Sequence, residues 1–164
     1  MIFDPTAFEN MKVVLEGATY DLDLGGKIRV VNRKDIVDLA TLSRLYEITY
    51  SLYGQASVFA TISLEAKLNQ LASEILKLGN QSHFGVFATI SYSWELNEKA
   101  KQYFKIIKDH WGPDYTYDER RIFSSLHGTK EEIKIDFTRL ITEDMIDDVV
   151  EMLHYSVEIL GKLR

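Results

Sequence analysis

The sequence predicts an α+β domain built on a mostly antiparallel β-sheet of six to seven strands, with helices mainly on one face. Several segments alternate apolar and polar residues with a period of two, which is typical of strands with one packed face. Other segments repeat apolar residues at i, i+3, i+4 and i+7, which predicts amphipathic helices. The 164 residues fit a single domain, 1–164.

The first third of the chain predicts a helix followed by short strands. The helix is expected to begin at Asp4-Pro5, because Asp caps helices and Pro suits the first helical position. Gly25-Gly26 is expected to form a hairpin turn between strands at 20–24 and 27–31. Residues 32–43 fit either a short helix or a loop.

An internal repeat organises the middle of the chain. The hexapeptide Val-Phe-Ala-Thr-Ile-Ser occurs unchanged at 58–63 and at 86–91, and the match continues in register into the segments that follow. Chance convergence of two amphipathic segments is the alternative explanation. The unbroken identity favours duplication, so 58–78 and 86–106 are expected to form matching strand–helix units.

The last third predicts two strands and a long helix. Gly112-Pro113 is expected to end the helix of the second repeat unit. The segments 122–127 and 133–141 then form a predicted hairpin that turns at Gly128-Thr129. A final helix is expected to begin at Thr142, with acidic residues near its start, as the helix dipole favours.

Composition and charge exclude several classes of protein. The chain has no cysteine, so it has no disulfide framework, thiolate metal site or cysteine nucleophile. The net charge is -6 and the basic pairs Arg33-Lys34 and Arg120-Arg121 have acidic neighbours, which argues against binding to nucleic acid. We expect no signal peptide and no membrane span, and therefore a cytoplasmic protein.

Catalytic and metal-binding motifs are scarce. The chain has no glycine-rich phosphate loop, no Gly-x-Ser-x-Gly elbow and no His-Glu-x-x-His. Glu151-x-x-His154 has the spacing of half a di-iron motif, but such a site needs the motif twice and further glutamates. A solvated polar stripe on a helix is the favoured interpretation, so we expect no metal and no cofactor.

The segment 111–121 mixes aromatic and ionisable residues densely, and it is expected to be a loop. Loops of this kind often carry binding or catalytic groups. The candidates are Tyr115, Tyr117, Asp118 and Arg121, together with His127. The favoured alternative is a plain helix-to-strand connection whose rings cover the edge of the core.

The period of two also predicts a second sheet face. If Val58 and Val86 point toward the helices, Phe59 and Phe87 must point away from them. The residues expected on the same face are Glu47, Thr49, Ser51, Thr61, Ser63, Thr89, Ser91, Phe123, Ser125 and His127. Lys and Glu would be the usual choice for a purely solvated sheet, so this hydroxyl-rich face with phenylalanines is expected to be covered.

These patterns favour a non-catalytic protein-binding domain, an adaptor, inhibitor or chaperone-like protein. A homodimer is expected, in which a two-fold axis pairs the Phe59 and Phe87 surface with its own copy. The partner is thus another protein or a second copy of the chain. The alternative is a small-molecule binder or an enzyme that uses a cleft between the sheet and the segment 111–121.

Overall fold

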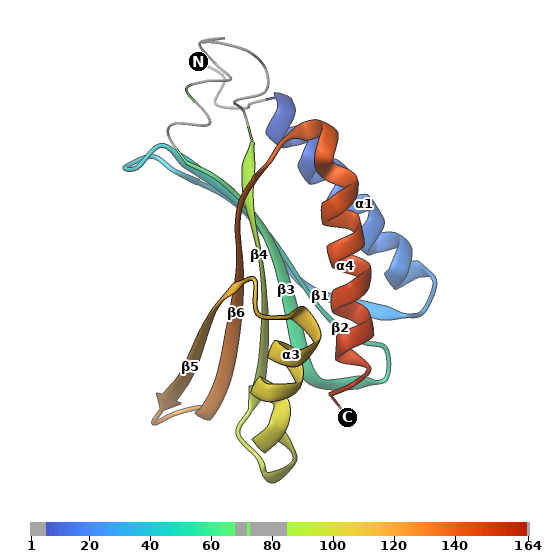
Figure 1. Ribbon diagram of the computed structural model, residues 1–164, viewed down its shortest axis with the longest axis vertical. Coiled ribbons are helices and arrows are strands. Elements are labelled where there is room, and N and C mark those ends of the chain that lie inside the picture. Colours follow the sequence, from blue (N-terminus) through green and yellow to red (C-terminus); the bar gives the residue numbers. More distant parts are fainter. Residues whose placement is uncertain (1–5, 68–71, 73–84, 164) are drawn as a thin grey trace.

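Six strands form one antiparallel sheet, in the order β1-β2-β3-β4-β6-β5, in the computed structural model, which describes residues 6–67, 72 and 85–163 (Figure 1). The strands are β1 (Ile28–Asp38), β2 (Ser43–Leu52), β3 (Gln55–Ala66), β4 (Val86–Glu95), β5 (Thr116–Ser124) and β6 (Gly128–Ile141). The helices of the described residues are α1 (Thr6–Leu24), α3 (Tyr103–Trp111) and α4 (Ile146–Leu160), with short 3-10 helices η2 (Glu98–Gln102) and η3 (Glu143–Met145). The α+β class is confirmed, and every strand pairing is antiparallel.

The helices α1, α3 and α4 lie on the same side of the sheet (Figure 1). Side-chain contacts from one sheet face reach all three of them. These contacts are Tyr46 to Glu16 of α1, Tyr50 to Ser156 of α4, and Trp94 to Tyr103 of α3. The other face of the sheet is therefore left without a helix among the described residues.

The core lies between this helical layer and the sheet. Alternate residues of the four inner strands are buried, and Val58 and Val86 are among them, at 5% and 0% exposure. The predicted orientation of the two hexapeptides is thus confirmed. Full burial of a large aliphatic side chain contributes about 1.5–3 kcal/mol, so this layer dominates the stability of the fold.

The N-terminal hairpin predicted at Gly25-Gly26 is wrong. Helix α1 continues to Leu24, because Leu22 is still buried against the core and extends the helical pattern. The two glycines end the helix: Gly26 has φ 75°, and the Lys27 amide donates a 3.0 Å hydrogen bond to the Leu22 carbonyl. Residues 32–38, expected to be a helix or a loop, belong to β1.

The boundaries of the last hairpin also differ from the expectation. The strand predicted at 122–127 is β5 and ends at Ser124, and β6 begins at Gly128. The turn between them is held by the Ser124 hydroxyl oxygen, which accepts the amides of Leu126 and His127 at 3.3 and 3.1 Å. The segment 111–121, expected to be a loop, is a strand from Thr116 onward.

The two identical hexapeptides are neighbours in the sheet. They run antiparallel, with Ile62 opposite Ile90 and Ser63 opposite Thr89. In the second unit, η2 and α3 follow the strand. The helical part expected at 68–78 lies outside the described residues apart from residue 72, so superposition of the complete units stays a prediction.

None of the helices among residues 6–67, 72 and 85–163 is long and apolar enough to cross a bilayer.

Candidate functional site

The sheet surface that points away from the helices is the candidate site, and we call it the open face. Its residues come from β2, β3, β4 and β6, and the strand register arranges them in rows across the sheet. One row is Thr49, Thr61, Ser91 and Lys134. The next rows are Glu47, Ser63, Thr89 and Asp136, and then Leu45, Glu65, Phe87 and Leu140.

Hydroxyl side chains occupy the centre of the open face. The Thr49 and Thr61 hydroxyls are 2.8 Å apart and hydrogen-bonded, and Ser63 is hydrogen-bonded to Thr89. Serine and threonine have short side chains, so the sheet surface forms a depression between the longer side chains around them. The centre therefore offers polar atoms close to the backbone, between taller side chains at either end.

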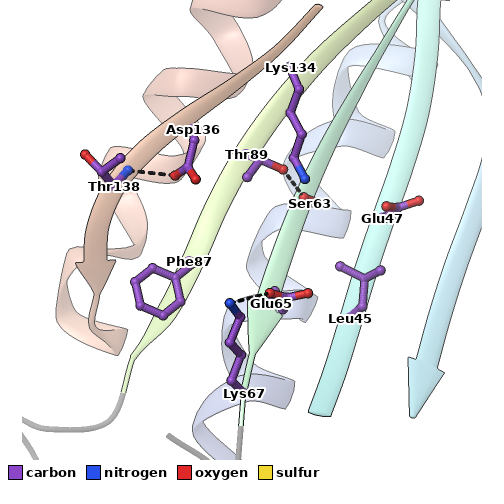
Figure 2. Close-up of a pocket in the computed structure, with 10 residues that line it drawn as sticks. All are labelled: Leu45, Glu47, Ser63, Glu65, Lys67, Phe87, Thr89, Lys134, Asp136 and Thr138. Carbon is purple, nitrogen blue, oxygen red and sulfur yellow. Dashed lines mark hydrogen bonds and ion pairs between the residues drawn. The ribbon is translucent and has the colours of Figure 1, made fainter. Parts of the chain in front are cut away.

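A hollow of about 330 Å³ opens over this centre. Figure 2 shows Ser63 and Thr89 in its middle, with Phe87 and Lys67 on one side. The Lys67 amino group is 3.8 Å from the Glu65 carboxylate and 5.9 Å from the centre of the Phe87 ring. The volume of the hollow lies at the lower end of the range of small-ligand pockets.

The hollow is lined by charges of both signs. Its acidic residues are Glu47, Glu65 and Asp136, and its lysines are Lys67 and Lys134. The Asp136 carboxylate accepts the Thr138 amide at 2.9 Å. Figure 2 shows Lys134 extended toward Ser63 and Thr89, whereas Glu47 stands on the opposite side. The lining therefore suits a ligand that carries both donors and acceptors.

The two phenylalanines of the open face, Phe59 and Phe87, lie at its opposite ends. Phe59 is opposite Ser93 and Phe87 is opposite Glu65, so the two rings stand about 20 Å apart along the strands. Both are half-buried. The rings therefore bracket the hydroxyl centre and do not form one continuous apolar patch.

The aromatic residues of the segment 111–121 pack against the helix side of the sheet. Tyr115 packs edge-on against Phe137, with ring centres 4.8 Å apart, and the Tyr117 hydroxyl donates to the Gly112 carbonyl at 2.5 Å. Burial raises the pKa of Tyr117. These contacts agree with the alternative interpretation, in which the rings cover the edge of the core.

The remaining candidates of this region are spread over different places. Asp118 lies opposite Lys134 on the open side of the sheet, whereas Arg121 lies opposite Glu131 on the helix side. His127 lies in the turn between β5 and β6. The structure thus does not bring Tyr115, Tyr117, Asp118, Arg121 and His127 together in one cleft.

Phe123 was expected on the open face, and this expectation is wrong. It is paired with Thr129, two residues before Glu131 on β6, so its side chain is on the helix side. None of the described helices covers it at the end of the hairpin, and Phe123 is 79% exposed. A one-residue difference in register is enough to reverse the face.

Sequence reasoning missed a buried acid, Glu131. Its side chain is 4% exposed, and its carboxylate accepts the Trp94 indole N–H at 3.2 Å and Arg121 at 2.9 Å. It borders a cavity of about 490 Å³ beneath η2 that is also lined by Leu96 and Phe104. The sequence did contain a signal for this residue. Glu131, Ile133 and Ile135 are alternate residues and share one face of the strand, so the pattern predicts an apolar residue at position 131.

A second missed group is a set of buried hydroxyls between the sheet and α4. The Tyr50 and Ser156 hydroxyls are 2.5 Å apart, and the Tyr92 hydroxyl donates to the Ser156 carbonyl at 3.3 Å. The Trp111 indole donates to the Tyr92 hydroxyl at 3.3 Å. Burial raises the pKa of both tyrosines, so they stay protonated and join α4 to the sheet.

No group of three metal-binding side chains occurs within the part of the chain that the structure describes. Glu151 and His154, the weak metal candidates, are both exposed on α4.

Comparisons of the chain with protein-family models, with curated proteins and with solved structures find no match. The geometry of the open face is thus the basis for a functional proposal.

Proposed function

We propose that the protein is a non-catalytic binding protein that holds another polypeptide on the open face, as an adaptor, inhibitor or chaperone-like domain. One observation carries this proposal. The sheet face with no described helix over it has hydroxyl groups at its centre and a half-buried phenylalanine at each end. A face selected only for contact with water would be richer in lysine and glutamate.

Each part of this surface has a role in binding. Phe59 and Phe87 provide apolar anchors, which are the groups that contribute most to protein–protein affinity when they become buried. The hydroxyls between them hydrogen-bond to a partner's polar groups. Glu47, Glu65 and Asp136 favour a partner with basic side chains, in keeping with the net charge of -6.

A photo-cross-linking residue placed on the open face tests the proposal. We expect Thr61 and Ser91, each replaced in turn, to give one and the same protein adduct in cells. Glu151, which is exposed on α4 away from the sheet, is the matched control position and should not give it. Adducts that form equally at all three positions, or none at Thr61 and Ser91, would contradict the proposal.

A homodimer remains part of the proposal. The separation of Phe59 and Phe87 leaves no single apolar patch that would meet its own copy. We therefore assign the open face to a different protein and seek the surface for self-association elsewhere on the molecule.

A further inference from the structure

Strand β5 has a free edge. It is the last strand of the sheet and pairs with β6 alone among the described elements. Figure 1 shows it at the margin of the sheet, with no helix beyond it. Seven of its nine residues are exposed. Its outward amides and carbonyls therefore remain available to another strand.

The side chains of β5 follow a symmetric pattern. Tyr117, Glu119, Arg121 and Phe123 share the helix side, because their partners on β6 are on that side. Read in either direction, this row is an aromatic residue, a charge, the opposite charge and an aromatic residue. Such a row is complementary to itself when a second copy runs antiparallel to it.

We propose that two copies of the chain pair through β5, antiparallel, with the two-fold axis at Arg120. Arg120 is the midpoint of the strand, so all nine residues of both strands find partners. Glu119 then lies opposite Arg121 of the second copy, and Tyr117 lies opposite Phe123 of the second copy. Each of these pairs occurs twice, as a two-fold interface requires.

The aromatic pairs explain the exposed phenylalanine. Phe123 is 79% exposed in the single chain, which is unusual for a ring at the end of a strand. In the dimer it packs on Tyr117 of the second copy. Cross-strand aromatic pairs stabilise a sheet more than alanine pairs do, and they also bury apolar area.

The opposite side of the strand tolerates this arrangement. The two Arg120 side chains face each other at the axis, but each is bound to its own Asp118 at 2.7 Å. Moving the axis by one residue would leave an end of each strand unpaired and place either Glu119 or Arg121 opposite its own copy. The midpoint register avoids both problems.

The inference rests on the homodimer of the proposed function and assigns it to a surface away from the open face. Failure of the β5 dimer leaves polypeptide binding on the open face standing, and failure of that binding leaves the β5 dimer standing. Photo-cross-linking on the open face tests the binding of another polypeptide, and disulfide formation between introduced cysteines tests the β5 dimer.

Introduced cysteines measure the register directly, because the chain has none of its own. In an antiparallel pair, opposite Cα atoms are about 4.5–5.5 Å apart, within the range that a disulfide spans. Under mild oxidation with oxidised glutathione, Arg120→Cys should form a covalent dimer. Ile122→Cys alone should not, since its two copies would lie about 13 Å apart. A mixture of Ile122→Cys with Asp118→Cys should give the mixed dimer.

Sedimentation of the chain without cysteine completes the test. The wild type should be a dimer, and Phe123→Asp should weaken its self-association at least tenfold while leaving the circular dichroism spectrum unchanged. A wild type that stays monomeric at high concentration overturns the proposal. So does a dimer in which Arg120→Cys fails to cross-link, or one in which Ile122→Cys alone cross-links as well as Arg120→Cys.

Discussion

Arg44 shows how this protein holds a charge inside its fold. Its side chain is 7% exposed, and its guanidinium is 3.1 Å from Asp35 and 3.0 Å from Glu9. The group also lies over the Phe8 ring, 4.7 Å from the ring centre. A buried charge is tolerated only when it is paired and hydrogen-bonded, so Arg44 ties α1 to strands β1 and β2.

Asp35→Asn should destabilise the protein by about 2 kcal/mol at pH 7, because hydrogen bonds to charged groups contribute about 1.5–3 kcal/mol. Burial alone would raise the pKa of Asp35, but hydrogen bonds and charges from Arg44 and Lys12 hold it below its usual 3.8. The contribution of this carboxylate is therefore complete above pH 3.8 and is lost as the pH falls through the lowered pKa. Urea unfolding at a series of pH values measures it.

The difference between wild type and Asp35→Asn should accordingly shrink in acid. A difference that is the same at pH 7 and at pH 2 would contradict this account. Glu98→Gln is the matched control, because its ion pair with Lys101 is exposed on both sides and contributes at most about 1 kcal/mol.

At the scale of single elements, two glycines differ in the space around them. A side chain at Gly85 would clash with its neighbours, whereas a side chain at Gly17 would have room. A Cβ at Gly85, just before β4, would lie 2.6 Å from the Leu140 side chain and 2.7 Å from the Ile141 carbonyl oxygen. A Cβ at Gly17, inside α1, would meet no atom within 4 Å. The first glycine lets β4 and β6 approach each other, and the second only loosens a helix.

Alanine at these two positions should have opposite effects. Gly85→Ala should destabilise the protein by about 1–3 kcal/mol, as overpacking does. Gly17→Ala should stabilise it by about 0.5–1 kcal/mol, because alanine restricts the unfolded chain and favours the helix. Thermal and urea unfolding of both variants measure the two effects. A neutral Gly85→Ala would show that the end of β6 moves away easily.

The sequence predicted the central strands better than the outer ones, for a physical reason. β3 and β4, the strands of the two predicted repeat units, have one buried face, so their apolar and polar residues alternate and the pattern is visible. β1 and β5 are exposed on both faces over most of their length, as at 32–38 and 118–123, and the alternation of buried and exposed residues disappears. The open face at Phe59 and Phe87 could therefore be predicted, whereas the location of Phe123 could not.

The candidate site was predicted only in part, because strand order is a long-range property. The sequence placed Phe59, Thr61, Phe87 and Thr89 on one face. It could not show that β3 and β4 are antiparallel neighbours, which puts the two rings at opposite ends. Nor could it place Lys134 and Asp136 beside the hydroxyl centre, because the neighbour of β4 in the sheet is β6 and not β5, the next strand along the chain.

At the scale of the whole molecule, the two proposed surfaces should respond to different substitutions. Phe59→Ser together with Phe87→Ser should reduce the protein adduct formed at Ser91 at least fivefold, since both anchors are lost. The same double variant should keep its fold, because each half-buried ring contributes only about 1 kcal/mol. It should also sediment like the wild type, because β5 is unchanged.

Leu24→Ser is the matched control for this double variant. Leu24 is 86% exposed at the end of α1, on the side of the helices, and its loss should leave the adduct at Ser91 unchanged. If the double variant unfolds, the two rings are part of the core and the open face is not a binding surface. If its adduct is undiminished, the partner does not use the phenylalanines.

The paired hexapeptides have a consequence for how the chain folds. Strand β2 pairs with residues 60–63 of the first hexapeptide in the finished sheet, but residues 88–91 of the second would offer it the same four side chains during folding. The two choices diverge only beyond the hexapeptide. The correct partner brings Leu64 opposite Tyr46, whereas the wrong one would bring Tyr92 there and crowd two large rings in the core. The residue that follows each hexapeptide, Leu64 or Tyr92, therefore favours the observed pairing of β2 over the alternative one.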